Sequence, residues 1–258
     1  MTNDESRGGV ASVAKACKVL RAFSPTVGVL SVRQVSARAG IPRSTAHELC
    51  RTLVSEGMLE GAGGGYQLGP LLLELAGQII ERTGLLRAGE GILDSLVRAP
   101  EQDAHLCQLT QGWIVYLDRN SSPSHVPAAN QVGQRAPAHL TVCGKVALSW
   151  LPFDKVVAHV EKCCAESAVP APDLKQLEAE LTQARQDGFL ASRSVQQGRT
   201  SVAAPIFDSS GTPIGGVSLS GPAGMFTTAV VESARASVTH AAGLISARLI
   251  SAAPAWTR

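Results

Sequence analysis

A short basic segment near the N-terminus carries side chains suited to contacting nucleic acid. It contains Arg43, Ser44, Thr45, His47 and Arg51. Arginine can donate two parallel hydrogen bonds to guanine, and Ser or Thr can bond to bases or phosphates. The spacing predicts one helix whose first residues enter the major groove, with Arg43 as the guanine reader. The alternative is a set of solvated charges on a small helical domain.

The positive charge of the chain is concentrated around this segment. Residues 6–55 hold eight Lys or Arg and one acid, Glu48, which is a net charge of +7, although the whole chain carries only +2. This asymmetry indicates a polyanionic partner for the N-terminal part alone. Arg33 and Arg38 precede the predicted reading helix, and we expect them to contact backbone phosphates, which set register rather than sequence.

Start and stop signals around the basic segment predict three helices. Residues 10–23 have apolar side chains three or four apart, as in an amphipathic helix. Ser31 and Gln34 form a capping-box pattern that opens a second helix, and Gly40 ends it. Pro42 suits the first turn of the third helix, where its missing N–H costs nothing.

A glycine-rich stretch, 61–65, separates two short strand candidates at 58–60 and 66–68. Three helices and a hairpin predict a winged helix-turn-helix over residues 10–69, after a flexible N-terminus at 1–9. The hairpin loop has no basic side chain, which indicates a weak wing contact with DNA.

The remaining residues predict an α+β domain behind a connecting helix. Residues 70–88 form the predicted helical linker, and its helix, from about Pro70 to Arg82, has a broad apolar face that belongs either to an ordinary core or to a contact with a second subunit. Residues 89–252 alternate strands with helices, which favours an α+β sensory domain. The strand candidates are 105–109, 114–118, 201–207 and 214–220, and the helix candidates are 89–98, 144–151, 173–187 and a long final helix over 231–249.

The string Gly40-Ile41-Pro42-Arg43-Ser44-Thr45-Ala46-His47 resembles the recognition helix of the IclR family of bacterial regulators. The likeness continues at 12–20, 51–53, 66–69, 132–137, 144–145, 198, 202–208 and 218–222, so it spans about residues 10–250. The resemblance implies a GAF-like effector-binding domain, dimers through the DNA-binding domains and often tetramers. It also implies control of a catabolic operon by a small organic acid or aromatic compound, by repression or activation.

The same resemblance implies the effector-binding residues. They are Val142, Cys143 and Gly144 from a loop, with Arg199, Ser201, Ser218 and Ser220. A helix beginning near Gly144 offers free backbone N–H groups to a carboxylate. Ser218 and Ser220 are two apart on a strand, so they share a face, which alternatively points to water. His125 and Trp113 are further candidates for the cavity wall, each with ordinary packing or a surface position as its alternative.

The chain departs from the family pattern at two positions near this predicted pocket. Ser194 stands where a glutamate is usual, and Ser201 stands where a cysteine is common, while Cys143 occupies the loop. These departures leave the identity of the effector open.

Two other classes of function compete with a ligand-controlled DNA binder. One is an enzyme with Cys143 as nucleophile and His139 or His125 as base, but no nucleophile motif supports it. The other is a thiol-based redox regulator that uses Cys143 or the Cys163-Cys164 pair. The six cysteines show no CxxC and no zinc spacing. We therefore expect a regulator with no catalytic activity, cofactor or metal.

The sequence also predicts where the protein works. Residues 1–9 are polar, without the apolar stretch of a signal peptide. The longest uncharged run, 209–231, is rich in Gly, Pro, Ser and Thr and reads as strand and turn rather than a membrane span. We expect a cytoplasmic protein that binds double-stranded operator DNA, a small-molecule effector and a second copy of itself.

Overall fold

The computed structural model describes residues 9–24, 27–99, 102–121, 131–167, 169–193 and 198–252. The chain forms two compact units, one ending at Arg82 and one beginning at Thr83. Each unit has its own hydrophobic core. The predicted flexible N-terminus lies outside the described residues except for Gly9.

The first unit is a helix-turn-helix with a two-stranded hairpin. Its elements are α1 (Ala11–Arg21), α2 (Val32–Ala39), α3 (Arg43–Ser55), β1 (Leu59–Ala62), β2 (Gly65–Leu68) and α4 (Pro70–Thr83). The predicted capping box is confirmed, because the Ser31 side chain accepts from the Gln34 amide and the Gln34 side chain accepts from the Ser31 amide. Gly40 ends α2 in the left-handed conformation, with φ of 64°. Val19, Leu30 and Leu59 lie at the centre of the core.

The second unit is built on an antiparallel sheet of six described strands in the order β5-β4-β3-β8-β7-β6. The strands are β3 (Asp103–Thr110), β4 (Trp113–Ser121), β5 (Arg135–Pro137), β6 (Leu190–Arg193), β7 (Arg199–Phe207) and β8 (Pro213–Pro222). The long central strands β3 and β8 pair with each other, so the sheet is most buried at this pair.

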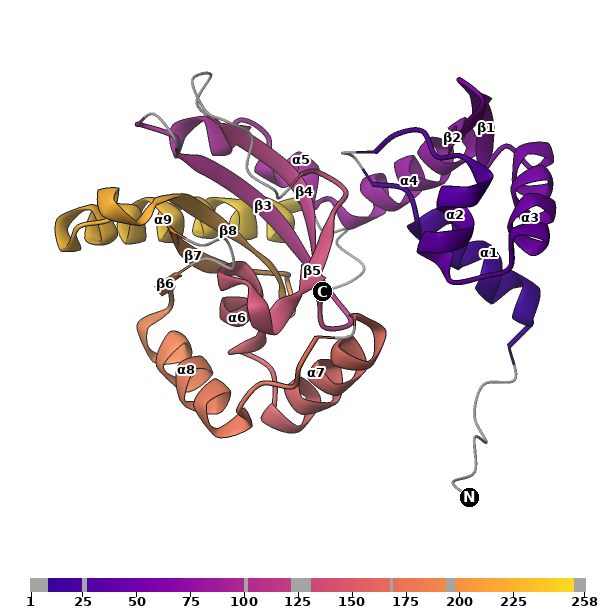
Figure 1. Cartoon of the computed structure of the whole chain (residues 1–258). Coiled ribbons are helices and arrows are strands. Elements are labelled where there is room, and N and C mark those ends of the chain that lie inside the picture. Colours follow the sequence, from indigo (N-terminus) through magenta and orange to yellow (C-terminus); the bar gives the residue numbers. More distant parts are fainter. Residues whose placement is uncertain are drawn as a thin grey trace. The chain divides into compact units, whose positions relative to one another are not determined.

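Helices cover both faces of this sheet (Figure 1). They are α5 (Leu85–Gly89), α6 (Val142–Leu148), α7 (Phe153–Ser167), α8 (Leu174–Asp187) and α9 (Thr228–Ala252), with short 3-10 turns η1 (Leu93–Ser95), η2 (Ala138–Leu140) and η3 (Ala223–Met225). On one face, α9 packs against alternate residues of β3, β7 and β8, such as Leu106 and Val217. On the other face, α6 packs with Cys107 and Ala203, and α8 covers α6. The predicted α+β fold class is confirmed.

The predicted helix from about Pro70 to Arg82 agrees with α4, but the linker over 70–88 is not one continuous helix, because Gly84 adopts φ of 63° and separates α4 from α5. Residues 89–98 form only the turn η1, since Gly91 also has a positive φ, of 72°. The helix α7 and the short strands β5 and β6 were not predicted. No helix among the described residues is long and apolar enough to cross a membrane.

Candidate nucleic-acid interface and ligand site

Helix α3 presents a basic stripe to solvent. Its buried face consists of Ala46, Cys50 and Leu53. Arg43, His47 and Arg51 follow one another at intervals of four residues, and all three are exposed, so they line one side of the helix. Ser44 is exposed beside this stripe, and Thr45 is half-buried. The structure therefore gathers the predicted base-reading residues on α3, with Thr45 the least accessible of them.

The predicted phosphate contacts on α2 have different surroundings. Arg33 is exposed, and no interaction of its side chain is found among the described residues. Arg38 is exposed too, but its Nη1 donates to the carbonyl oxygen of Ala22 at 3.0 Å. Ala22 follows the last residue of α1. Arg38 thus ties α2 to the end of α1, whatever it contributes to DNA.

The hairpin is fixed to the rest of the first unit by backbone hydrogen bonds. Leu30 and Tyr66 exchange two of them, at 2.9 and 2.8 Å. Gly65 lies directly against this contact, since a Cβ there would sit 2.6 Å from the Leu30 carbonyl oxygen. Gly63 and Gly64 turn the hairpin with positive φ. The wing is therefore firmly placed although it lacks basic residues.

In the second unit, polar side chains gather on the α6-facing side of the central strands. We call this set the buried polar patch: Asp103, His105, Ser201, Ser218 and Ser220, each no more than 8% exposed. The strand register joins them, because Asp103 pairs with Ser220, His105 with Ser218 and Ser201 with Ser220. Both predicted serines of β8 are thus buried rather than facing water. Strand alternation sends Val217 and Leu219 to the opposite core.

A buried carboxylate anchors two arginines at the edge of this patch. Asp103 is fully buried, and its Oδ1 and Oδ2 lie 3.0 Å from Arg119 Nη2 and 2.7 Å from Arg199 Nη2. The Ser121 hydroxyl donates to the same carboxylate at 2.5 Å. A buried charge is stable only when it is paired and hydrogen-bonded, as here. The structure therefore places the predicted Arg199 beside Asp103 and Arg119, which the sequence had not singled out.

The N-terminal turn of α6 closes over the patch. Val142, Cys143 and Gly144 are all buried. Of the amide groups at the start of this helix, that of Gly144 is not free for a carboxylate, because it donates to Thr141 Oγ1 at 2.9 Å. A Cβ at position 144 would collide with the Ala138 backbone. Gly144 is therefore required for close packing of α6 on η2.

Two cysteines meet between α6 and the sheet. Cys143 accepts hydrogen bonds from the thiol of Cys107 and the hydroxyl of Ser218, and these bonds hold the pKa of Cys143 below its ordinary value despite burial. Burial raises the pKa of Cys107. Gly216 pairs with Cys107, and a Cβ there would lie 3.3 Å from the Cys143 carbonyl oxygen. The missing side chain of Gly216 lets α6 approach the sheet here.

Burial also sets the protonation state of His105, the imidazole of the patch. Desolvation lowers the pKa of His105 to about 4, the nearby Asp103 opposes this shift, and Arg119 and Arg199 add to it. The ring meets Tyr116 edge to face at a centroid distance of 5.4 Å. His105 is consequently neutral near pH 7. Its position was hidden in sequence because a single histidine in an apolar strand has the same pattern as ordinary core.

The remaining residues singled out in the sequence lie either away from the patch or outside the residues that the structure describes. His125 is outside the described residues, as is Ser194. Trp113 packs under the Arg135 guanidinium, 3.8 Å from the ring centroid, which fits its packing alternative. Neither nitrogen of His139 has a hydrogen-bond partner in the part of the chain that the structure describes, so the hydrogen bond to Cys143 that the enzyme hypothesis required is not formed.

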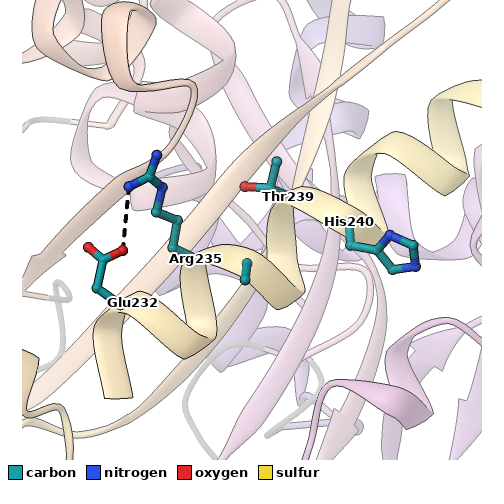
Figure 2. A pocket seen from close by; sticks show the side chains of 5 residues that line it. Glu232, Arg235, Thr239 and His240 are labelled. Carbon is teal, nitrogen blue, oxygen red and sulfur yellow. Dashed lines mark hydrogen bonds and ion pairs between the residues drawn. The ribbon is translucent and has the colours of Figure 1, made fainter. Parts of the chain in front are cut away.

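A separate open hollow lies on the solvent side of α9 (Figure 2). It has a volume of about 470 Å³, and its lining residues are Glu232, Arg235, Ala236, Thr239 and His240. Arg235 and Glu232 pair across one turn at 3.4 Å. None of the predicted effector residues lines it, and its charged groups are paired and exposed. The described residues contain no cluster of three potential metal ligands.

Comparison with known proteins identifies the family of the chain. Residues 12–62 match the family model of the IclR helix-turn-helix domain, and residues 77–247 match that of the bacterial transcriptional regulator IclR C-terminal region. The HTH-type transcriptional regulator XynR of Escherichia coli is 29% identical over 216 residues, which cover 82% of this chain and 86% of XynR. The HTH-type transcriptional regulator TtgV of Pseudomonas putida is 30% identical over 183 residues, or 70% of each chain.

Solved structures share the fold. An IclR homologue from Microbacterium hydrocarbonoxydans, solved in complex with 4-hydroxybenzoate, superposes with a TM-score of 0.74 at 24% identity and covers 93% of this chain and 100% of its own. Two family models together span the described helix-turn-helix and most of the second unit. The chain belongs to the IclR family of bacterial transcriptional regulators, with a helix-turn-helix DNA-binding domain followed by an IclR effector domain.

Proposed function

We propose that this regulator binds a specific operator through α3, and that a small organic or aromatic carboxylate modulates this binding from the buried polar patch. The patch carries the proposal. Five polar side chains converge on the central strands of an otherwise apolar sheet, beside two arginines. Burial of so many polar groups away from water favours a site built for a polar ligand over ordinary core.

On α3 we assign base reading to Arg43, with support from Ser44, His47 and Arg51. Arg43 is the first residue of the helix and is exposed. A side chain at that end reaches base edges when the helix enters the major groove. In this proposal, Arg33 and Arg38 contact backbone phosphates. A regulator that binds operator DNA works where bacterial DNA lies, so we propose a cytoplasmic location.

For the effector, we assign carboxylate binding to the arginine end of the patch. The guanidinium groups of Arg199 and Arg119 supply paired donors of the geometry that carboxylates accept. The hydroxyl groups of Ser218 and Ser220 donate to Cys143 and to the Asp103 carbonyl oxygen, so their oxygens add acceptors along the same face, and Ser201 adds a further hydroxyl group. The 4-hydroxybenzoate complex of a homologue of the same fold supports an acid of this class.

A second copy of the chain fits the exposed apolar residues of α4. Leu73 and Ile79 are 76% and 54% exposed, and Leu75 and Ile80 each 41%. Four large apolar side chains on one helix form an unusual surface for a solvated face. We propose that α4, together with the DNA-binding domain at residues 10–69, forms the dimer interface, and that the domain at 89–252 allows a tetramer.

The function is tested by titrating the protein onto DNA fragments from upstream of its own gene and the adjacent operon, with fluorescence anisotropy as the readout. We expect tight binding to one fragment and a change in affinity when a matching carboxylate from a panel of aromatic and aliphatic acids is added. Thermal-shift measurements identify that acid, because a bound ligand raises the melting temperature.

The patch is tested by Ser218→Ala combined with Ser220→Ala. This double variant should bind operator normally but require at least about tenfold more effector, because two hydroxyl groups of the proposed site are lost. The matched control, Ser233→Ala with Ser251→Ala, changes two exposed serines of α9 and should respond as wild type. A normal response of the patch variant would show that the effector binds elsewhere.

A thiol-based redox regulator is a second candidate, and the contact between Cys107 and Cys143 favours it. The pair Cys163-Cys164 does not, since the thiol of Cys163 donates to Gly112 and that of Cys164 to Pro170. Treatment with hydrogen peroxide would join Cys107 to Cys143, with both thiols oxidised and peroxide reduced to water. Operator affinity that stays unchanged after peroxide would eliminate this candidate.

A further inference from the structure

One nitrogen of the buried polar patch is left without a partner. His105 is 2% exposed, and its Nε2 makes no hydrogen bond in the structure. Buried polar side-chain atoms almost always have a partner, and leaving one unpaired is costly. The unpaired nitrogens of His139 and Trp150 lie outside the patch, whereas that of His105 lies among its serines and arginines, so His105 is the residue that a ligand in the patch would pair.

The position of His105 places that bond in the ligand site. His105 is the direct cross-strand neighbour of Ser218 on β8 and of Arg119 on β4. Side chains opposite each other on one face of a sheet lie within contact distance. Arg119 holds Asp103, and Ser218 bonds to Cys143. The imidazole thus lies between the arginine end of the patch and the α6 turn that covers it.

The chemistry of a neutral imidazole defines what it would bind. His105 carries one N–H and one lone pair near pH 7, because burial lowers its pKa. A hydroxyl group both donates and accepts, so it satisfies Nε2 in either tautomer. A second carboxylate would satisfy only the N–H form, and a methyl group would satisfy neither.

We propose that His105 is the specificity residue of the effector site, and that its Nε2 bonds a hydroxyl group of an effector whose carboxylate lies at the Arg119–Arg199 end. The effector is then a hydroxycarboxylate rather than a simple carboxylate. This inference rests on the proposed effector function and narrows its ligand class.

Matched acids that differ by one hydroxyl group test it. The pairs are 4-hydroxybenzoate with benzoate, 3-hydroxybenzoate with benzoate, mandelate with phenylacetate, and lactate with propionate, each titrated by calorimetry. In at least one pair the wild type should bind the hydroxylated acid about tenfold or more tightly, since its hydroxyl pairs a buried atom that the other acid leaves unpaired.

Variants then assign this preference to His105. His105→Phe keeps a planar ring without a nitrogen, and it should bring the affinity ratio of that pair to about one while benzoate or its counterpart still binds. His105→Gln retains a polar group at a similar reach and should restore part of the ratio. His139→Phe is the matched control, because it removes another buried imidazole that lies on η2 rather than in the patch, and it should keep the wild-type ratio.

The ratio of affinities within each pair of acids is measured on the wild type, so it tests the proposal even if His105→Phe does not fold. Equal affinities within every pair, or no binding of any hydroxylated acid, would overturn it. So would a ratio that survives His105→Gln and His105→Phe, or one that His139→Phe also abolishes. If non-hydroxylated acids bind and shift operator affinity, the proposed function stands and this inference alone fails. If operator affinity responds to no acid of any kind, the proposed function fails as well.

Discussion

The arginines of the DNA-binding domain differ in what holds them. Arg38 already bonds to the Ala22 carbonyl, whereas Arg43 projects from the first turn of α3 with its guanidinium exposed. Arg43→Ala should reduce the preference for operator over random DNA by roughly 10- to 100-fold, the effect of losing one bidentate base contact. Anisotropy titrations with both DNAs measure this ratio. Lys18→Ala removes the same charge from α1 and should weaken both affinities without changing their ratio. An unchanged ratio for Arg43→Ala would exclude base reading by this residue.

At the same scale, His105 makes stability depend on pH. Burial lowers its pKa to about 4 from 6.5, so between these values the unfolded chain binds a proton that the native chain does not. Stability therefore falls as the pH decreases through this window. Between pH 7 and pH 5, the free energy of unfolding of wild type should drop by about 2 kcal/mol more than that of His105→Gln. Urea unfolding measures it, and equal drops would mean that His105 is protonated in the native state. His139 and His159 titrate alike in both proteins, so they cancel.

At the scale of elements, α4 leaves several large apolar side chains exposed to solvent. Leu75→Glu with Ile79→Glu should raise the dimer dissociation constant by roughly 100-fold, because two large apolar side chains would no longer be buried between subunits. Light scattering coupled to size exclusion gives the mass across a dilution series. Gln78→Glu places a charge on an exposed position of the same helix and should leave the mass unchanged. A double variant that stays dimeric would place the interface elsewhere.

Sequence predicted elements well where local chemistry dictates them. Ser31, Gln34 and Gly40 mark the ends of α2 by hydrogen bonds and φ that depend only on neighbouring residues. The short edge strands β5 and β6 were missed, because their pairing depends on distant partners such as Trp113 and Ala203. The same limit applied to the ligand site. Ser218 and Ser220 were predicted from the family resemblance, and their spacing placed them on one face, but Asp103 and Arg119 meet across strands, and sequence alone does not give that register.

For the whole molecule, the proposed function requires that two ligands bound to different units influence each other. If the effector changes operator affinity by some factor, operator DNA must change effector affinity by the same factor. Calorimetric titration of the effector with and without saturating operator fragment should reproduce the factor found by anisotropy. Random DNA of equal length serves as the control and should give a smaller change. Unequal factors would mean that the two measurements do not report the same equilibrium.

The separate hydrophobic cores of the two units have a practical consequence for engineering. Val19, Leu30 and Leu59 belong to a core that shares no residue with the sheet of the second unit. Each unit thus carries its own means of staying folded, which is the condition for exchanging one without redesigning the other. A chimera that joins residues 83–258 to the DNA-binding domain of another IclR regulator would make a biosensor whose ligand site is the buried polar patch. Its reporter promoter would then be chosen independently of the acid that it detects.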